Sequence, residues 1–245
     1  MRQASARVEN RIDPVAREIF RPVQCRNIQN KEAAMASETP VPVTAGSAFP
    51  KGKFFVIEPS FWGGGKIPGV EVVNEDRLRL PGTYIIESPN GDPGQYPERP
   101  HLVHVPKMGG MPRDFENLFG MWIVSEALKR VFESVDPEGF AFAACDFTLA
   151  DGTPGPQYYF CGVLRTLDAL DEAASRLKIK VGDYVNGKFY SLSGGANLVF
   201  REEVVGSAHI FLTPFTDTVF CDRALRDAVK VADVKGVALH DAADY

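Results

Sequence analysis

One unit of sequence occurs twice in this chain and constrains its fold more than any other feature. The first copy, WIVSEALKRVFESVDPEGFAF, spans residues 122–142, and the second, VFCDRALRDAVKVADVKGVAL, spans residues 219–239. The copies align without a gap, residue 122 falling on residue 219. Each is typical of a short strand, a capped helix, a glycine and a second strand. The alternative to a duplication is chance similarity between two ordinary strand–helix–strand pieces.

The two helices are predicted from their caps and their apolar faces. Ser125 and Asp222 can each accept a hydrogen bond from an N–H group of the first helical turn, which has no partner inside the helix. After the caps, apolar residues recur in pairs four positions apart, which places them on one helical face. Gly139 and Gly236 are expected where the helices end, in a left-handed conformation. The apolar residues are Ala127, Leu128, Val131, Phe132 and Val135 in the first copy and Ala224, Leu225, Ala228, Val229 and Ala232 in the second.

Most of the remaining chain reads as strands and turns. Strands are predicted over residues 53–58, 70–73, 83–87, 101–105, 140–147, 209–215 and 237–239. Turn residues predict one hairpin that brings Cys145 opposite Cys161 and a second with a two-residue Asn186-Gly187 turn. A short helix is expected over residues 170–177. The chain is therefore predicted to be an α+β protein with mixed, mainly antiparallel sheets, the duplicated strand–capped helix–strand unit and few helices.

The overall composition is that of a globular protein. Hydrophobic residues make up 44% of the chain and charged residues 24%. No run of about 18 apolar residues could span a membrane, and the N-terminus lacks the apolar core of a secretory signal. We therefore expect a cytoplasmic protein with reduced thiols. The net charge of -5 weighs against nucleic acid as a partner, because phosphate binding needs clustered basic residues.

The N-terminal segment differs from the rest of the chain. Residues 1–31 contain seven basic and three acidic residues, and residues 36–50 are rich in Pro, Ser, Thr and Ala. We predict a disordered extension over residues 1–50 and a folded α+β domain over residues 51–245, which could comprise two similar halves. A targeting segment or a nucleic-acid arm is the alternative for the basic stretch. Translation could begin at Met35 rather than Met1.

No pattern of residues points to catalysis, a cofactor or a metal. None of the four cysteines belongs to a C-x-x-C pair. His101 and His104 lie on opposite faces of a predicted strand, which is poor geometry for a shared metal. The glycine run before Lys66 lacks the Ser or Thr of a phosphate-binding loop. A nucleophilic pair of Cys161 and His209 is conceivable, but a buried cysteine and an ordinary histidine explain these residues as well.

Several motifs resemble one known family. The first motif in chain order is Val124-Ser125-Glu126 at a helix start. The second is one stretch in which DG and a proline precede YYFCGVLRTLDALD. The others are YSLSGGANLVF, and VFCDRALRDA followed by KGV. Together they resemble the family-11 immunity proteins of bacterial polymorphic toxin systems, long catalogued as a domain of unknown function. The resemblance covers residues 53–245, and the basic segment before Met35 lies outside it.

The resemblance implies a protein that stays in the cytoplasm of the producing cell and binds a cognate secreted toxin domain. Inhibition would be steric, because a folded surface would cover the active site of the toxin. The acidic balance agrees with this expectation, since nuclease toxins are often basic and opposite charge speeds association. Neither a membrane nor nucleic acid is an expected partner, and the oligomeric state is open. A structural or adaptor module with a partner that is not a toxin, or an uncharacterised enzyme, is the alternative function.

The family has no motif that fixes the contact residues, so the candidates come from this sequence. They are acids expected at the surface and an aromatic residue in a loop, because aromatic anchors are enriched at binding hot spots. The acids near residue 170 could instead cap the short helix predicted there. The candidate contact residues are Trp62, Asp168, Asp171, Glu172, Glu202 and Glu203.

Overall fold

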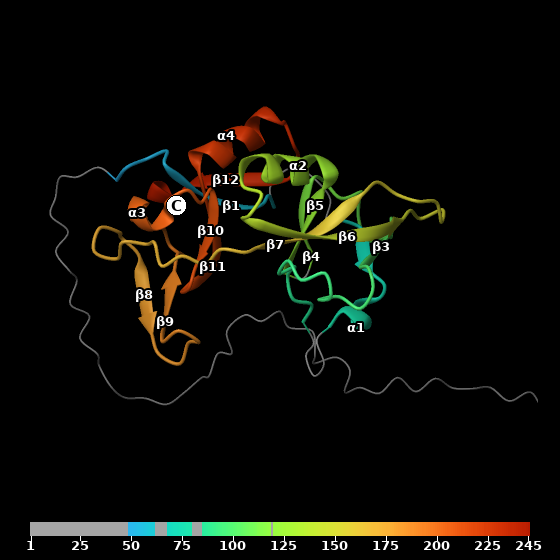
Figure 1. Ribbon diagram of the computed structural model, residues 1–245, viewed down its shortest axis with the longest axis horizontal. Coiled ribbons are helices and arrows are strands. Elements are labelled where there is room, and N and C mark those ends of the chain that lie inside the picture. Colours follow the sequence, from blue (N-terminus) through green and yellow to red (C-terminus); the bar gives the residue numbers. More distant parts are fainter. Residues whose placement is uncertain (1–48, 62–67, 80–84, 119) are drawn as a thin grey trace, which may run out of the picture. The chain divides into compact units, whose positions relative to one another are not determined.

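Two β-sheets contain most of the strands in this protein, and one long helix packs on each (Figure 1). The structure is a computed structural model that describes residues 49–61, 68–79, 85–118 and 120–245. Trp62, Lys66 and residues 1–48 lie outside the described residues. The extension over residues 1–50, its boundary with the folded domain and the choice between Met1 and Met35 therefore stay predictions.

The first sheet is mixed. Its strands are β2 (Val70–Val72), β3 (His101–His104), β4 (Phe115–Leu118), β5 (Met121–Ser125), β6 (Phe140–Thr148) and β7 (Tyr158–Val163). Their order across the sheet is β2-β3-β6-β7-β5-β4, and only the pair β3 and β6 is parallel.

The second sheet is antiparallel throughout and includes the first strand of the described chain. Its strands are β1 (Phe54–Pro59), β10 (Ile210–Thr213), β11 (Thr216–Asp222) and β12 (Val237–Asp241), in the order β10-β11-β1-β12. A separate hairpin consists of β8 (Lys178–Val181) and β9 (Lys188–Ser191).

Helices are few, as predicted. Those of the described chain are α1 (Glu75–Leu78), α2 (Glu126–Val135), α3 (Glu202–Val205), α4 (Arg223–Val231) and the 3-10 helix η2 (Ala242–Asp244). The prediction of an α+β fold with mixed, mainly antiparallel sheets is thus confirmed.

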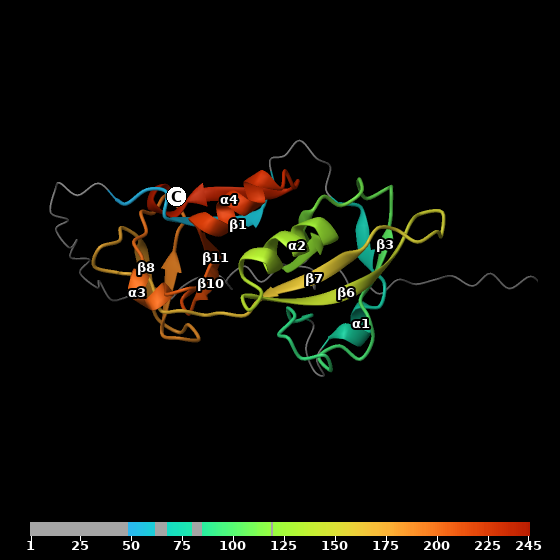
Figure 2. The ribbon, with the colours of Figure 1, turned by 45° about the horizontal axis from the view of Figure 1, so that its top comes forward.

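Both predicted helix caps are present. The Ser125 hydroxyl accepts a hydrogen bond from the Leu128 N–H at 3.2 Å, and the Asp222 carboxylate accepts one from the Leu225 N–H at 3.0 Å. The predicted apolar faces are buried at their centres, at Leu128, Phe132, Leu225 and Val229, because α2 and α4 pack against each other and share one hydrophobic core (Figure 2). The predicted face residues Ala127, Ala224 and Ala232 are exposed. The duplicated pattern therefore produces two equivalent capped helices whose apolar faces meet.

The repeat extends from the helices to the sheets around them. In the first half of the fold, β5 and β6 flank β7 in the order β4-β5-β7-β6. In the second half, β11 and β12 flank β1 in the order β10-β11-β1-β12. Each half is thus a hairpin, a helix and a strand, with one further strand inserted between the hairpin and that last strand. We use "first half" and "second half" for these two groups of elements.

The registers of the two halves also correspond. Ile123 of β5 pairs with Phe160 of β7, and the equivalent Phe220 of β11 pairs with Val56 of β1. At the other end of the inserted strand, the Leu164 N–H donates to the Gly139 carbonyl at 2.9 Å. The Ser60 N–H donates in the same way to the Gly236 carbonyl at 2.7 Å. Chance similarity of two short pieces does not account for agreement over five elements in each half.

The two repeated glycines let the halves approach each other. A Cβ atom on Gly139 would lie 2.6 Å from the Ile210 side chain at the start of β10. A Cβ atom on Gly236 would lie 2.5 Å from the Phe115 carbonyl oxygen at the equivalent position of β4. Only Gly236 has a positive φ, of 89°, so the predicted left-handed conformation is wrong for Gly139. Neither glycine immediately follows the last residue of its helix, since α2 ends at Val135 and α4 at Val231.

The predicted strands are confirmed at six places, and four local predictions need correction. Of the strand predicted over residues 83–87, residues 85–87 form no strand, and residues 83 and 84 lie outside the described residues. Residues 170–177 make one turn instead of a helix, because the Arg176 N–H pairs with the Asn197 carbonyl. Hairpin β8–β9 has a loop over residues 182–187 instead of a two-residue turn. Within hairpin β6–β7, Cys145 pairs with Tyr158 and Cys161 with Phe142, so the two cysteines are not opposite each other.

Candidate functional site

The β8–β9 hairpin presents apolar side chains to solvent. Val185 in its loop is fully exposed and Val181 is 82% exposed, while Ile179 and Tyr184 are partly exposed. The hairpin is seen at the lower left of Figure 1. Exposed apolar residues that gather in one place and have charged neighbours are typical of a protein-binding surface. We call residues 178–191 the exposed hairpin.

The base of the exposed hairpin is fixed to the second half of the fold. Tyr190 is buried, and its N–H donates to the Phe215 carbonyl at 2.8 Å. The Lys188 ammonium lies 4.1 Å from the centre of the Phe215 ring. The Asn186 amide donates to the Pro214 carbonyl. These contacts hold the apolar tip in place, which lowers the entropy that a partner would lose by ordering it.

Two of the predicted contact acids, Glu172 and Asp168, lie beside this base, and, in addition to burial, the charges of both raise the pKa of Tyr190. Glu172 pairs with Lys188 and accepts a hydrogen bond from the Tyr190 hydroxyl at 2.5 Å. Asp168 forms an ion pair with Arg201 at 3.6 Å. The structure therefore brings these acids next to the exposed hairpin, where basic residues balance part of their charge.

Asp171, a third predicted contact acid, acts mainly as a cap. Its carboxylate accepts hydrogen bonds from the Ala173 and Ala174 N–H groups, both at 3.0 Å. The capping role considered for the acids near residue 170 is thus realised, although the segment is a single turn.

Two of the remaining predicted contact residues, Glu202 and Glu203, follow Arg201 directly in the chain. Glu202 begins α3 and pairs with Lys53, whereas Glu203 is exposed. Within the described residues, Glu203 has neither an ion pair nor a hydrogen bond through its carboxylate, so its charge is uncompensated. Trp62 lies outside the described residues, and its role stays a prediction.

Contacts with the base of the hairpin shift the ionisation of two groups. Hydrogen bonds from Lys188 and Tyr190 hold the pKa of Glu172 below its usual range. Burial, together with the hydrogen bond to Glu172, raises the pKa of Tyr190. Both groups are thus fixed in their ordinary neutral-pH forms, Glu172 charged and Tyr190 protonated. They are suited to holding the hairpin and not to transferring protons.

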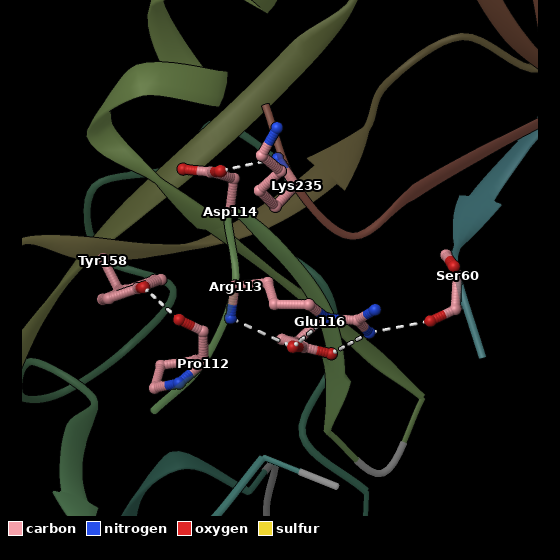
Figure 3. A network of polar contacts seen from close by, with 7 residues as sticks. All are labelled: Ser60, Pro112, Arg113, Asp114, Glu116, Tyr158 and Lys235. Atoms are coloured by element: carbon pink, nitrogen blue, oxygen red, sulfur yellow. Dashed lines mark hydrogen bonds and ion pairs between the residues drawn. The ribbon is translucent and has the colours of Figure 1, made fainter. Parts of the chain in front are cut away.

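A buried network of charges between the halves is also structural. The Arg113 guanidinium donates to both carboxylate oxygens of Glu116, which is almost fully buried, and to the Ser60 carbonyl at 2.7 Å (Figure 3). In the same figure, the Asp114 carboxylate accepts the Lys235 N–H at 2.7 Å. These bonds connect β4 to the segments that follow β1 and precede β12.

A second cluster of this kind surrounds Asp136. Its carboxylate accepts hydrogen bonds from the Arg165 guanidinium and, at 2.9 Å, from the His209 N–H. Burial alone would raise the pKa of Asp136, but these two hydrogen bonds outweigh it and leave the pKa below the ordinary value. Each half therefore uses the base of its hairpin to bond to the helix–strand connection of the other.

The conceivable nucleophilic pair has the wrong environment for catalysis. Cys161 is buried in the core, and burial raises its pKa, so its thiol stays protonated at neutral pH. His209 is engaged with the Asp222 carboxylate at 2.8 Å. The interpretation of Cys161 as a packing residue is confirmed.

The described residues contain no group of three His, Cys, Asp or Glu side chains that could hold a metal ion. His101 instead lies 2.9 Å from the Thr148 hydroxyl. Each helix of the described chain is too short or too polar to span a bilayer.

Reasoning from the sequence missed the apolar tip of the exposed hairpin. The signal was present in KIKVGDYVNGKFY, where Val181 and Val185 lie close to Asn186-Gly187. Valines so near a turn have few neighbours to cover them, which would have marked them as exposed.

Comparison with known sequence families gives a match over most of the chain. None of the curated proteins matches this chain. The sequence model of the immunity protein family (Imm11) matches residues 53–244, which includes both halves of the fold, the exposed hairpin and all six predicted contact residues. Since the match spans well over half of the sequence, the chain belongs to the Imm11 immunity protein family.

Proposed function

We propose that this protein binds a cognate secreted toxin domain in the cytoplasm of the producing cell and blocks it sterically, with the exposed hairpin as the main contact. Membership of an immunity family supports the inhibitory role and implies one without catalysis. The carrying observation is the tip at Val181 and Val185, which is apolar, exposed and attached to a fixed base. Apolar contacts surrounded by polar residues are the usual centre of a protein interface.

The predicted contact acids have a secondary role in this proposal. Asp168, Glu172 and Glu202 are paired with basic residues, so they contribute hydrogen-bonding groups more than net charge. Glu203 carries an uncompensated charge and is the best candidate to steer a basic toxin toward the hairpin. Trp62 stays a predicted contact.

Co-expression tests the function itself. The probe is the C-terminal domain of the toxin encoded beside the gene for this protein. Cells that produce the toxin domain together with this protein are expected to grow, and cells that produce the toxin domain alone are expected to arrest. Continued arrest when this protein is abundant and folded would refute immunity for that pair. A partner other than a toxin would then become the leading alternative.

Calorimetric titration with an inactivated toxin domain tests the surface. Val185→Ser is expected to weaken binding by about tenfold, since truncation of an interface anchor costs about 1–2 kcal/mol. The matched control is Val231→Ser, because Val231 at the end of α4 is 86% exposed. Equal affinities for the two variants would remove the hairpin from the interface while leaving the immunity function standing.

The steering role of Glu203 is tested by association rates. Glu203→Gln is expected to slow association at low salt and to have little effect at high salt, because screening suppresses long-range attraction. Glu71→Gln makes the same change of net charge at an exposed position in β2. Similar rates for both variants would leave only a general effect of net charge.

A further inference from the structure

One edge of the first sheet is open beside a cavity. Strand β6 pairs with β7 along residues 140–145, but its pairing with β3 begins only at Asp146. In the part of the chain that the structure describes, no strand pairs with the other side of residues 140–145. A cavity of about 470 Å³ lies at this edge and is lined by Phe142, Ala143 and Ala144 of β6 and by residues of the loop 89–100. Its volume lies within the range of about 300–1,000 Å³ that ligand sites occupy.

The backbone groups of Phe142 and Ala144 point toward this open side. Alternate residues of a strand direct their N–H and C=O groups to opposite edges. The Asp146 N–H donates to the Pro100 carbonyl, on the β3 side. The Phe147 carbonyl accepts from the Gly155 N–H, on the β7 side. Odd-numbered residues of β6 therefore pair with β7, and even-numbered residues direct their backbone groups to the β3 side, where the cavity lies.

The cavity also carries a net negative charge. Glu98 is balanced by Arg77, with 3.0 Å between their nearest atoms, and Arg99 pairs with Asp146 at 3.6 Å. Asp92 has no ion pair among the described residues, and one of its carboxylate oxygens accepts the Gly94 N–H at 2.8 Å. The charge of Asp92 is therefore left to interact with an occupant.

We propose that this groove receives an extended segment of the cognate toxin domain, which adds a short strand to the open edge of β6 and places a lysine or arginine beside Asp92. An extended polypeptide supplies alternating N–H and C=O groups that can pair with the outward backbone groups of Phe142 and Ala144. The basic side chain complements the uncompensated Asp92. This inference rests on the proposed function and adds a second contact, separate from the exposed hairpin.

The first test removes one outward N–H group. Proline has no N–H, and it is tolerated where the N–H of an edge strand faces away from the sheet. Ala144→Pro leaves the pairing with β7 intact, because the Ala144 N–H faces the cavity. The variant is expected to bind the inactivated toxin domain about tenfold more weakly, from the lost hydrogen bond and the bulk of the ring. Its urea midpoint is measured alongside.

The second test changes the charge alone. Asp92→Asn keeps the oxygen that accepts the Gly94 N–H and is expected to weaken binding by about two- to fivefold. Asp151→Asn is the matched control, because the Asp151 carboxylate caps a similar turn by accepting the Thr153 N–H at 2.9 Å and does not line the cavity. Equal binding by both variants would oppose the proposed basic contact.

The third test compares amide hydrogen exchange in the free wild-type protein and in its complex with the toxin domain, so its result does not depend on the folding of a variant. The amides of Phe142 and Ala144 are expected to exchange at least tenfold more slowly in the complex than in the free protein. If the toxin domain binds but these amides remain unprotected, the edge pairing is overturned and the immunity function stands. If the wild-type protein does not bind the toxin domain at all, the proposed function fails first.

Discussion

Where the two halves approach closely, the cost of a positive φ and the cost of overpacking can be measured separately by glycine-to-alanine variants. Three glycines serve as probes of unfolding free energy. Gly236 has a φ of 89° and a Cβ there would lie 2.5 Å from a backbone oxygen. Gly152, in the β6–β7 turn, has a nearly equal φ of 85° and open space around it. Gly139 has no positive φ, but a Cβ there would lie 2.6 Å from Ile210.

The expected magnitudes follow from these geometries. An alanine forced to a positive φ costs about 1–2 kcal/mol, and the reduced freedom of the unfolded chain returns about 0.4–1 kcal/mol. Gly152→Ala should therefore cost about 1 kcal/mol. Overpacking adds about 1–3 kcal/mol, so Gly236→Ala should cost about 2–4 kcal/mol. Gly139→Ala should cost about 0–2.5 kcal/mol, because overpacking costs about 1–3 kcal/mol, the unfolded chain returns about 0.4–1 kcal/mol, and the Ile210 side chain can move.

Urea unfolding followed by circular dichroism measures these differences. With a slope of about 2 kcal/mol per molar urea, Gly236→Ala should lower the midpoint by about 1–2 M and Gly152→Ala by about 0.5 M. The slopes should agree with that of the wild-type protein, so that midpoints report stability. Equal midpoints for the two variants would refute the claim that Gly236 is needed for contact between the halves.

Three further predictions concern single groups. Asp222→Ala should cost about 1–2 kcal/mol of unfolding free energy in urea titrations, because the Leu225 N–H loses its cap, and Asp222→Asn should cost less. Since the pKa of Asp136 is lower in the folded than in the unfolded protein, its ionised form adds stability that is present above about pH 4 and lost as the pH falls through the folded pKa. Urea midpoints of Asp136→Asn should therefore vary less than those of the wild-type protein between about pH 5 and pH 3. In a Cys25→Ser variant, Ellman's reagent should label no thiol until the protein unfolds, because the other cysteines are buried and burial raises the pKa of Cys145 to about 12.

The parts of the fold that depend on short-range signals could be predicted from the sequence. Ser125 and Asp222 each precede an apolar pattern of period 3.6, and both caps are present, with the large apolar residues at the centre of each face buried. Pro214 has no N–H group and so limits the strand predicted over residues 209–215 to a sheet edge, and β10 is an edge strand. In each case the sequence signal lies within a few residues of the element that it predicts.

The parts that depend on distant partners could not be predicted in this way. Nothing near Phe54–Pro59 indicates that this strand belongs between β11 and β12. The segment 170–177 has helical periodicity, but its backbone N–H groups form hydrogen bonds with carbonyl groups of residues 197–199 instead. The sequence predicts that Gly139 ends a helix, but a glycine is needed there because a Cβ atom would meet the Ile210 side chain of the other half. For the candidate site, the acids were found from their charge, whereas their ion pairs and the apolar hairpin tip depend on tertiary structure.

The position of β1 affects how the protein emerges from the ribosome. The strands β4 to β7 are contiguous in the chain, so that half can assemble once residue 163 has left the exit tunnel. Strand β1 is made earlier, yet both of its neighbours, β11 and β12, are synthesised only after the whole first half. Until β11 and β12 have been synthesised, both edges of this apolar strand are unpaired and prone to wrong pairing. Completing the second sheet is therefore a late step, and a nascent chain truncated before residue 237 should remain a target for chaperones.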